Sequence, residues 1–117
     1  MIPPIHSRTD VLFSALSLES SQTSSTSSIR ECVGYSIQVV WKDGSATEGT
    51  LIIEGSNDYY DEAVPVFTPV RSIPIVDGDG DLLLNYERAM YASVRLRWIA
   101  AVGTGGTIRA KLVIKLA

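Results

Sequence analysis

The sequence contains few of the residues that build reactive or metal-binding sites. Its 117 residues include one cysteine, Cys32, and one histidine, His6. A single cysteine excludes an internal disulfide and a metal cluster held by several cysteines. We interpret Cys32 as a small hydrophobic residue near a strand start, with a reactive thiol as the alternative. A catalytic triad or zinc site centred on histidine would have to recruit His6 from the N-terminal segment, so we do not expect an enzyme.

Long apolar segments and an excess of basic charge are also absent. The N-terminal segment does not begin with a positively charged stretch followed by an apolar one, so we expect no secretion signal. No run approaches the roughly 18 apolar residues that span a bilayer. Ten basic residues stand against 13 acidic ones, a net charge of −3, so no overall positive field attracts nucleic acid or an anionic membrane. We expect synthesis and folding in a cytoplasm and no membrane partner, although a local basic face is compatible with these numbers.

Most of the chain alternates apolar and polar residues between clusters of turn residues. This period of two is typical of strands with one buried face. The chain is long enough for one domain, and about eight strands at about ten-residue spacing predict an all-β fold, an antiparallel β-sandwich or jelly roll. The clearest strand segments are Tyr35–Trp41, Glu48–Glu54, Leu82–Tyr86, Tyr91–Trp98 and Thr107–Lys115.

The turn residues between these segments predict two hairpins. Asp43-Gly44 suits a tight turn into the next strand, because glycine accepts positive φ without a Cβ clash. Gly103-Thr-Gly-Gly106 joins the last two strands in the same way. Val64–Phe67 and Ser72–Val76 each carry a proline, which predicts two short strands at a sheet edge or strand end.

Residues 1–28 are predicted to form an extended N-terminal arm, and residues 29–117 the β-sandwich domain. The arm has a possible first strand, with a short helix as the alternative, in Asp10–Leu18. A hydroxyl-rich run, Glu19–Ser28, follows. This run is either a mobile surface loop or a hinge that lets the first strand pair with a neighbouring subunit, and the sequence does not separate the two.

Three aspartates at alternate positions are the best candidate metal ligands: Asp77, Asp79 and Asp81. Carboxylates so spaced can converge on a hard cation such as Ca²⁺. The EF-hand motif is excluded, because Leu82 and Arg88 occupy the positions at which its loop requires glycine and an acidic residue. A solvated turn is the favoured interpretation, and we expect no cofactor.

Basic residues on the outward face of the predicted last hairpin form a candidate partner surface. Cross-strand neighbours lie about 5 Å apart, so these cations would make a positive stripe for an acidic partner or nucleic acid. Tyr91 and Trp98 are in phase with the inward residues, so we do not expect nucleic acid. A solvated sheet face and a protein-contact surface both stay open. The residues are Arg95, Arg97, Arg109, Lys111 and Lys115.

A polar aromatic loop is the candidate for glycan binding. It combines aromatic faces with hydrogen-bonding carboxylates and an amide, and an exposed loop at one end of the sandwich is the alternative. Two carboxylates in a flexible loop of so small a domain give no glycosidase cleft. The residues are Asn57, Asp58, Tyr59, Tyr60 and Asp61.

The order of these motifs resembles small virion-associated proteins of tailed bacteriophages. The similarity covers about two-thirds of the chain, from Ser28 to Lys115, and departs from the pattern at Tyr59–Val66, where related proteins tend to place a tryptophan. The matching segments are Tyr35–Trp41, Gly49–Asp58, Tyr91–Trp98 and the Gly-Thr-Gly turn into the lysine-rich last strand.

The resemblance implies a structural role on a phage particle, as a capsid decoration protein, a head-fibre domain or a tail component. It implies capsid or tail subunits as partners, a homo-oligomer and a location in the virion. A carbohydrate-binding module that attaches to a cell-surface glycan through Tyr59 and Tyr60 is the alternative.

Overall fold

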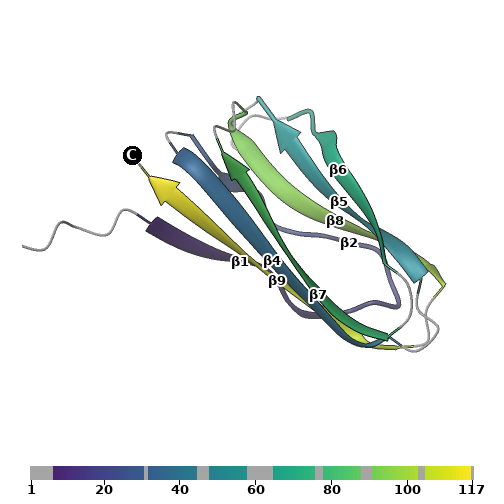
Figure 1. The fold of residues 1–117 in the computed structure, drawn as a ribbon. Coiled ribbons are helices and arrows are strands. Elements are labelled where there is room, and N and C mark those ends of the chain that lie inside the picture. Colours follow the sequence, from purple (N-terminus) through teal and green to yellow (C-terminus); the bar gives the residue numbers. More distant parts are fainter. Residues whose placement is uncertain are drawn as a thin grey trace, which may run out of the picture.

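The computed structural model describes residues 7–30, 32–44, 48–57, 65–75, 78–87, 91–102 and 105–116. Every helix or strand assigned within these ranges is a strand, and the strands form two layers (Figure 1). They are β1 (Ser7–Ser17), β2 (Gln22–Thr23), β3 (Ser27–Ser28), β4 (Cys32–Gly44), β5 (Glu48–Ser56), β6 (Thr68–Ile75), β7 (Gly78–Glu87), β8 (Ser93–Val102) and β9 (Thr107–Leu116).

The two sheets have the strand orders β1-β9-β4-β7 and β2-β8-β5-β6, and β3 also pairs with β8. We call them the first and the second sheet. All the strand pairs are antiparallel. The chain crosses between the sheets after β1, β3, β4, β6, β7 and β8, which is the double Greek-key order of a jelly roll. The predicted all-β sandwich or jelly roll is therefore confirmed, and β2 and β3 share the place of one strand beside β8.

Both predicted hairpins are wrong. β4 lies in the first sheet while β5 lies in the second, and β8 and β9 are separated in the same way. Alternation and turn residues require only that each strand bury one face. Two consecutive strands meet that requirement either by pairing edge to edge or by facing each other across the core. The sequence pattern is the same in both cases.

Of the two predicted strands that carry a proline, Ser72–Val76 corresponds to the second half of β6, whereas the described residues of Val64–Phe67 precede β6 and are not in a strand. β6 includes both Pro69 and Pro74, and it pairs only with β5, at the end of the second sheet. A strand at this position tolerates missing N–H donors on its outer side, so the predicted edge location is confirmed. β7 starts at Gly78, and Asp79 and Asp81 therefore belong to a strand and not to a turn.

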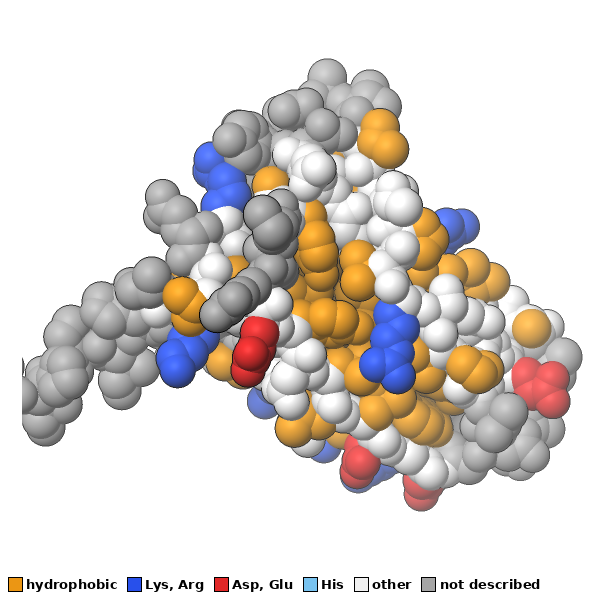
Figure 2. All heavy atoms as spheres, turned by 45° about the horizontal axis from the view of Figure 1, so that its top comes forward, with side chains coloured by type: hydrophobic (Ala, Val, Ile, Leu, Met, Phe, Trp, Pro, Cys, Tyr) orange, Lys and Arg blue, Asp and Glu red, His pale blue; other side chains and the backbone are white. Residues whose placement is uncertain are grey.

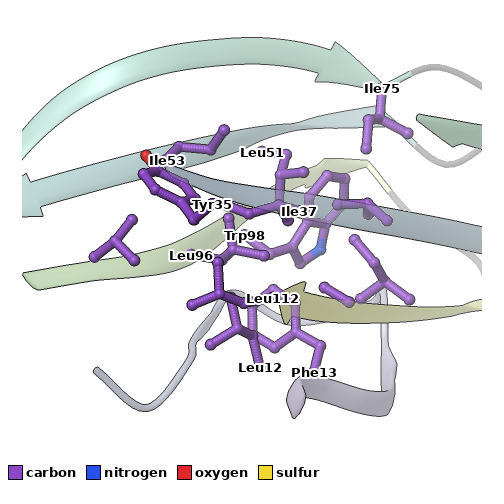
Figure 3. Packing of buried hydrophobic residues seen from close by; sticks show 14 of the residues in the cluster. Leu12, Phe13, Tyr35, Ile37, Leu51, Ile53, Ile75, Leu96, Trp98 and Leu112 are labelled. Carbon is purple, nitrogen blue, oxygen red and sulfur yellow. The ribbon is translucent and has the colours of Figure 1, made fainter. Parts of the chain in front are cut away.

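The core lies between the sheets and includes the predicted inward residues of β4, β8 and β9 together with residues of β1, β5 and β6 (Figure 3). Trp98 of β8 is fully buried, and its Nε1 donates a hydrogen bond of 3.0 Å to the Leu18 carbonyl oxygen. Trp41, at the end of the inward row of β4, is only half-buried. The inward phases are thus confirmed for β4, β8 and β9. Their buried members are Tyr35, Ile37, Val39, Val94, Leu96, Trp98, Ile108, Ala110, Leu112 and Ile114.

The N-terminal part of the chain contributes to this core. β1 pairs with β9 of its own chain, so Asp10–Leu18 is a strand up to Ser17 and the helical alternative is wrong. Leu12 and Phe13 are both buried, because the pairing register shifts between Val11 and Phe13. Pairing of β1 with a neighbouring subunit stays a prediction.

The hydroxyl-rich run is held against β8. The amide of Leu96 donates a 2.8 Å hydrogen bond to Ser24 Oγ, and the Ser24 amide donates to the Leu96 carbonyl oxygen at 2.8 Å. The Ala100 amide donates to Ser21 Oγ at 3.1 Å. Serine oxygens before and after β2 therefore accept hydrogen bonds from amides of β8, so this segment is part of the second sheet and the interpretation as a mobile surface loop is wrong.

The two long edges of the sandwich are covered to different extents. On the side of β1 and β2 the chain continues across the core, and Leu18 and Ile29 are almost completely buried there. On the side of β6 and β7, Ile73, Leu82 and Leu84 pack against the core but stay half-buried. A band of hydrophobic side chains is visible on one side of the molecule (Figure 2).

Candidate functional site

The five basic residues predicted to form one stripe lie on opposite outer faces of the sandwich. Arg95 and Arg97 belong to β8 in the second sheet. Arg109, Lys111 and Lys115 belong to β9 in the first sheet. The single stripe is therefore wrong, for the same reason as the last hairpin. The two groups have to be considered separately as contact surfaces.

On the second sheet, Arg95 and Arg97 are engaged by a buried carboxylate. Glu54 of β5 is only 4% exposed and lies directly across the ladder from Arg95. Arg95 Nε donates to Glu54 Oε1 at 2.8 Å, and Arg97 Nη1 lies 3.8 Å from Glu54 Oε2. The Arg95 guanidinium also lies 3.9 Å from the centre of the Phe67 ring, a cation–π contact. This cluster stabilises the fold, and it leaves Arg95 little capacity for a partner.

On the first sheet, the outward residues of β9, β4 and β7 form a mixed surface that we call the β9–β4–β7 face. β9 places three cations there, and β4 places uncharged residues at its centre and the exposed Lys42 towards its end. β7 places Asp79, Asp81, Leu83 and Glu87 there, all exposed. The charge thus changes from positive to negative across the sheet.

The strand register aligns these opposite charges in rows. Val40 of β4 pairs with Arg109 on one side and with Asp81 on the other. Gly34 in the same way lies between Lys115 and Glu87. Strands are spaced about 4.8 Å apart, so the charges of a row are about 10 Å apart at the backbone. Within the described residues, no ion pair joins them.

Apolar side chains and hollows occur on the same face. Leu83 is 60% exposed and Val113 is 40% exposed, and exposed aliphatic side chains beside unpaired charges are a common composition of a contact surface. Hollows of about 560 Å³ and about 160 Å³ lie over β4. The larger one is lined by Val33, Gly34, Tyr35, Ser36, Asn85, Tyr86, Glu87, Val113 and Lys115.

Three tyrosines cluster at one end of the sandwich. Tyr35 stacks on Tyr86 with ring centres 5.0 Å apart, and it meets Tyr91 edge to face at 6.3 Å. The hydroxyls of Tyr35 and Tyr91 share a short hydrogen bond. Burial, and then this hydrogen bond, raises the pKa of Tyr35 far above its usual value, and burial raises the pKa of Tyr91. Neutral phenols at every physiological pH indicate a structural cluster.

The other predicted candidates are only partly described. Asp79 and Asp81 are exposed on one face of β7, whereas Asp77 lies outside the described residues. No group of three potential metal ligands occurs within the described ranges. A helix able to cross a bilayer is likewise not found there.

The glycan candidates Asp58, Tyr59, Tyr60 and Asp61 also lie outside the described residues. Asn57, which precedes them in the sequence, lines a hollow of about 400 Å³ together with Gly55, Ser56, Val66, Thr68, Pro69, Val70 and Tyr91. Asn57 was part of the predicted glycan loop, and it is exposed.

Sequence reasoning missed the acidic half of the β9–β4–β7 face. Asp81 was assigned to a turn, and Glu87 was not considered as a partner of the β9 cations. The signal was present, because Asp79, Asp81, Leu83, Asn85 and Glu87 share one phase of two. Only the order of the strands places that phase beside Arg109 and Lys115.

The comparisons with known proteins support the fold. No protein-family model matches the chain, and no curated protein matches it. A chain from the structure of infectious bursal disease virus, Gx strain, is similar with a TM-score of 0.50 and 13% sequence identity. The match covers 94% of this chain and 32% of that chain. The present chain thus spans about one-third of that longer viral chain, and the likeness concerns the β-sandwich architecture.

Proposed function

We propose that this protein is a structural component of a tailed-bacteriophage particle, a capsid decoration or head–tail protein. It acts through contacts with other virion subunits and with copies of itself. The observation that carries the proposal is the β9–β4–β7 face, where exposed aliphatic side chains lie beside rows of opposite charge, Arg109 with Asp81 and Lys115 with Glu87. Such a face suits protein contact.

Two further observations support the particle role. The order of the sequence motifs resembles virion-associated proteins of tailed phages. The jelly roll is a fold that viral capsid proteins use, although the fold alone does not fix function. The solved chain that is similar in fold belongs to a virus structure, and its sequence is only 13% identical to this one.

The test is incorporation into particles. A tagged copy produced during phage infection should sediment with purified particles through a density gradient and stay bound after a second gradient. Particles formed without it should accept the purified protein in vitro at a fixed number of copies. A chain that stays at the top of the gradient in both experiments contradicts the proposal.

The structure also limits which truncations are informative. Removal of residues 1–28 would delete Phe13 and Leu18, which are 1% and 0% exposed in the core, so loss of assembly would only report unfolding. Removal of residues 1–6 leaves β1 intact. We expect this shorter truncation to fold, and its assembly measures the contribution of the N-terminal segment.

Glycan binding is the second candidate, favoured by the hollow that Asn57 of the predicted loop lines. Ser56, Asn57 and Thr68 offer polar groups there beside the Tyr91 ring, a combination that suits a sugar. A glycan array should then show binding that Tyr59→Ala and Tyr60→Ala remove while Tyr86→Phe preserves it. Absence of any bound glycan, or binding unchanged by both substitutions, excludes this alternative.

A further inference from the structure

We propose that the β9–β4–β7 face is a self-association surface, on which a second copy of this chain stacks face to face about a twofold axis parallel to β4. The inference rests on the self-association included in the proposed function. It identifies the surface through which two copies associate and the pairs of charges that meet there. Neither follows from the proposed role on a particle.

The charges that β9 and β7 place on the face are complementary to those of a second copy, whereas Lys42 of β4 lies near the proposed axis at one end of the face. Arg109, Lys111 and Lys115 lie on one side of β4, and Asp81 and Glu87 lie on the other. A copy that is turned over presents the same pattern in mirror order. Its acidic strand can therefore lie over the basic strand of the first copy, and the reverse holds at the same time, as a twofold interface requires.

The charges select one orientation of the symmetry axis. An axis in the plane between the sheets and parallel to β4 places β9 of each copy over β7 of the other. An axis across the strands places β9 over β9 and β7 over β7, which brings like charges together. Like charges placed across an interface are strongly unfavourable, so the parallel axis is the one that the sequence of this face supports.

The register then identifies the pairs. Rotation about an axis parallel to β4 preserves positions along that strand. Arg109 and Asp81 are in register with the same residue, Val40, so Arg109 of one copy faces Asp81 of the second. Lys115 and Glu87 share Gly34 and meet in the same way. Packed sheets are about 10 Å apart, a gap that arginine and lysine bridge to carboxylates.

The size of the face is compatible with a reversible dimer. In this arrangement β9, β4 and β7 face strands of the second copy, and three strands at about 4.8 Å spacing, with about ten residues at about 3.3 Å each, span roughly 14 by 33 Å. This is about 460 Å² per copy, and the total of about 900 Å² is in the range of weak, transient complexes. Val40, Leu83 and Val113 supply an apolar centre, while the rows of charge fix the orientation.

The experiment measures the dimer dissociation constant by sedimentation equilibrium of the purified full chain at low ionic strength. Arg109→Asp and Asp81→Arg are each expected to weaken the dimer at least tenfold, because each places like charges opposite one another twice per dimer. The double variant Arg109→Asp/Asp81→Arg restores both pairs and should return to within about threefold of the wild type. Addition of salt should weaken the wild-type dimer.

Arg71→Asp is the matched control, because it makes the same change of charge on β6 in the second sheet. It should leave the dissociation constant unchanged, and circular dichroism should show all variants folded. The proposal is overturned by a wild type that stays monomeric at millimolar concentration, by single variants that behave like Arg71→Asp, or by a double variant that is no tighter than the single ones. Particle incorporation is measured separately, so a monomeric chain that still joins particles overturns the dimer and leaves the virion role standing.

Discussion

The substitution Gly49→Ala tests how tightly the two sheets are packed around Trp98. Gly49 lies in the inward phase of β5, and a Cβ added there would lie 2.6 Å from Cζ2 of Trp98 and 2.6 Å from the Ile99 carbonyl oxygen. The ring is fully buried and held by its hydrogen bond to Leu18. Neither the ring nor a backbone carbonyl can move without displacing other core residues.

The magnitude follows from these contacts. Overpacking of a well-filled core costs about 1–3 kcal/mol, and loss of the indole hydrogen bond adds about 1 kcal/mol. The reduced entropy of the unfolded chain returns about 0.4–1 kcal/mol. We therefore expect Gly49→Ala to lower the free energy of unfolding by about 2–3 kcal/mol, measured by urea denaturation with tryptophan fluorescence.

Gly80→Ala provides the matched comparison. A Cβ at Gly80 would lie 2.5 Å from Cε2 of the Trp41 ring, and all three nearest atoms belong to that side chain. Trp41 is half-buried at the end of its row, so its ring can turn outward. We expect a loss of less than about 1.5 kcal/mol. A Gly49→Ala variant no less stable than Gly80→Ala would refute the account of a rigidly held Trp98.

Three further predictions concern polar groups and the backbone. A double-mutant cycle on the free energy of unfolding should give a coupling of about 1–2 kcal/mol between Glu54→Gln and Arg95→Gln. The coupling between Glu54→Gln and Arg97→Gln should be below about 0.5 kcal/mol, because Arg97 is further from Glu54 and half-exposed. Equal couplings for the two arginines contradict this prediction. The raised pKa of Tyr35 stabilises the fold fully below about pH 10 and less as the pH rises further, by about 1.4 kcal/mol per unit. Tyr35→Phe should flatten the alkaline decline of stability by that slope, and an unchanged slope counts against the burial of the Tyr35 hydroxyl. Ala15 has a φ of 53°, so Ala15→Gly should stabilise by up to about 1 kcal/mol, and a destabilised variant shows that Ala15 is not strained.

The sequence predicts which side chains of a strand point into the core better than it predicts which strands pair with each other. The inward phase of Tyr35, Ile37 and Val39 follows from alternation alone, and all three are almost completely buried. Alternation has a local cause, because successive side chains of a strand point to opposite sides. The phase of β9 could be predicted for the same reason.

Pairing is not local, and the failures of prediction are failures of pairing. Asp43-Gly44 has the composition of a hairpin turn, yet it ends a strand whose successor lies in the other sheet. Glu54 is charged and nevertheless 4% exposed, because Arg95 and Phe67 come to it from other segments. Nothing in the residues next to Glu54 predicts that burial.

The same reasoning decides where a contact surface can be found in this fold. In a jelly roll the chain changes sheet at most of its connections, so strands adjacent in sequence seldom share a surface. Arg95 and Arg109 are close in sequence and lie on opposite outer faces, whereas Asp81 and Arg109 share one face with Val40 between them. A cluster of like charge in the sequence is therefore dispersed by this topology, and charges of opposite sign from distant segments are brought into rows. If such rows direct assembly, the strand register decides which charges meet across the interface. Reversing the charges of one pair at a time therefore tests this specificity more directly than removing several basic residues at once.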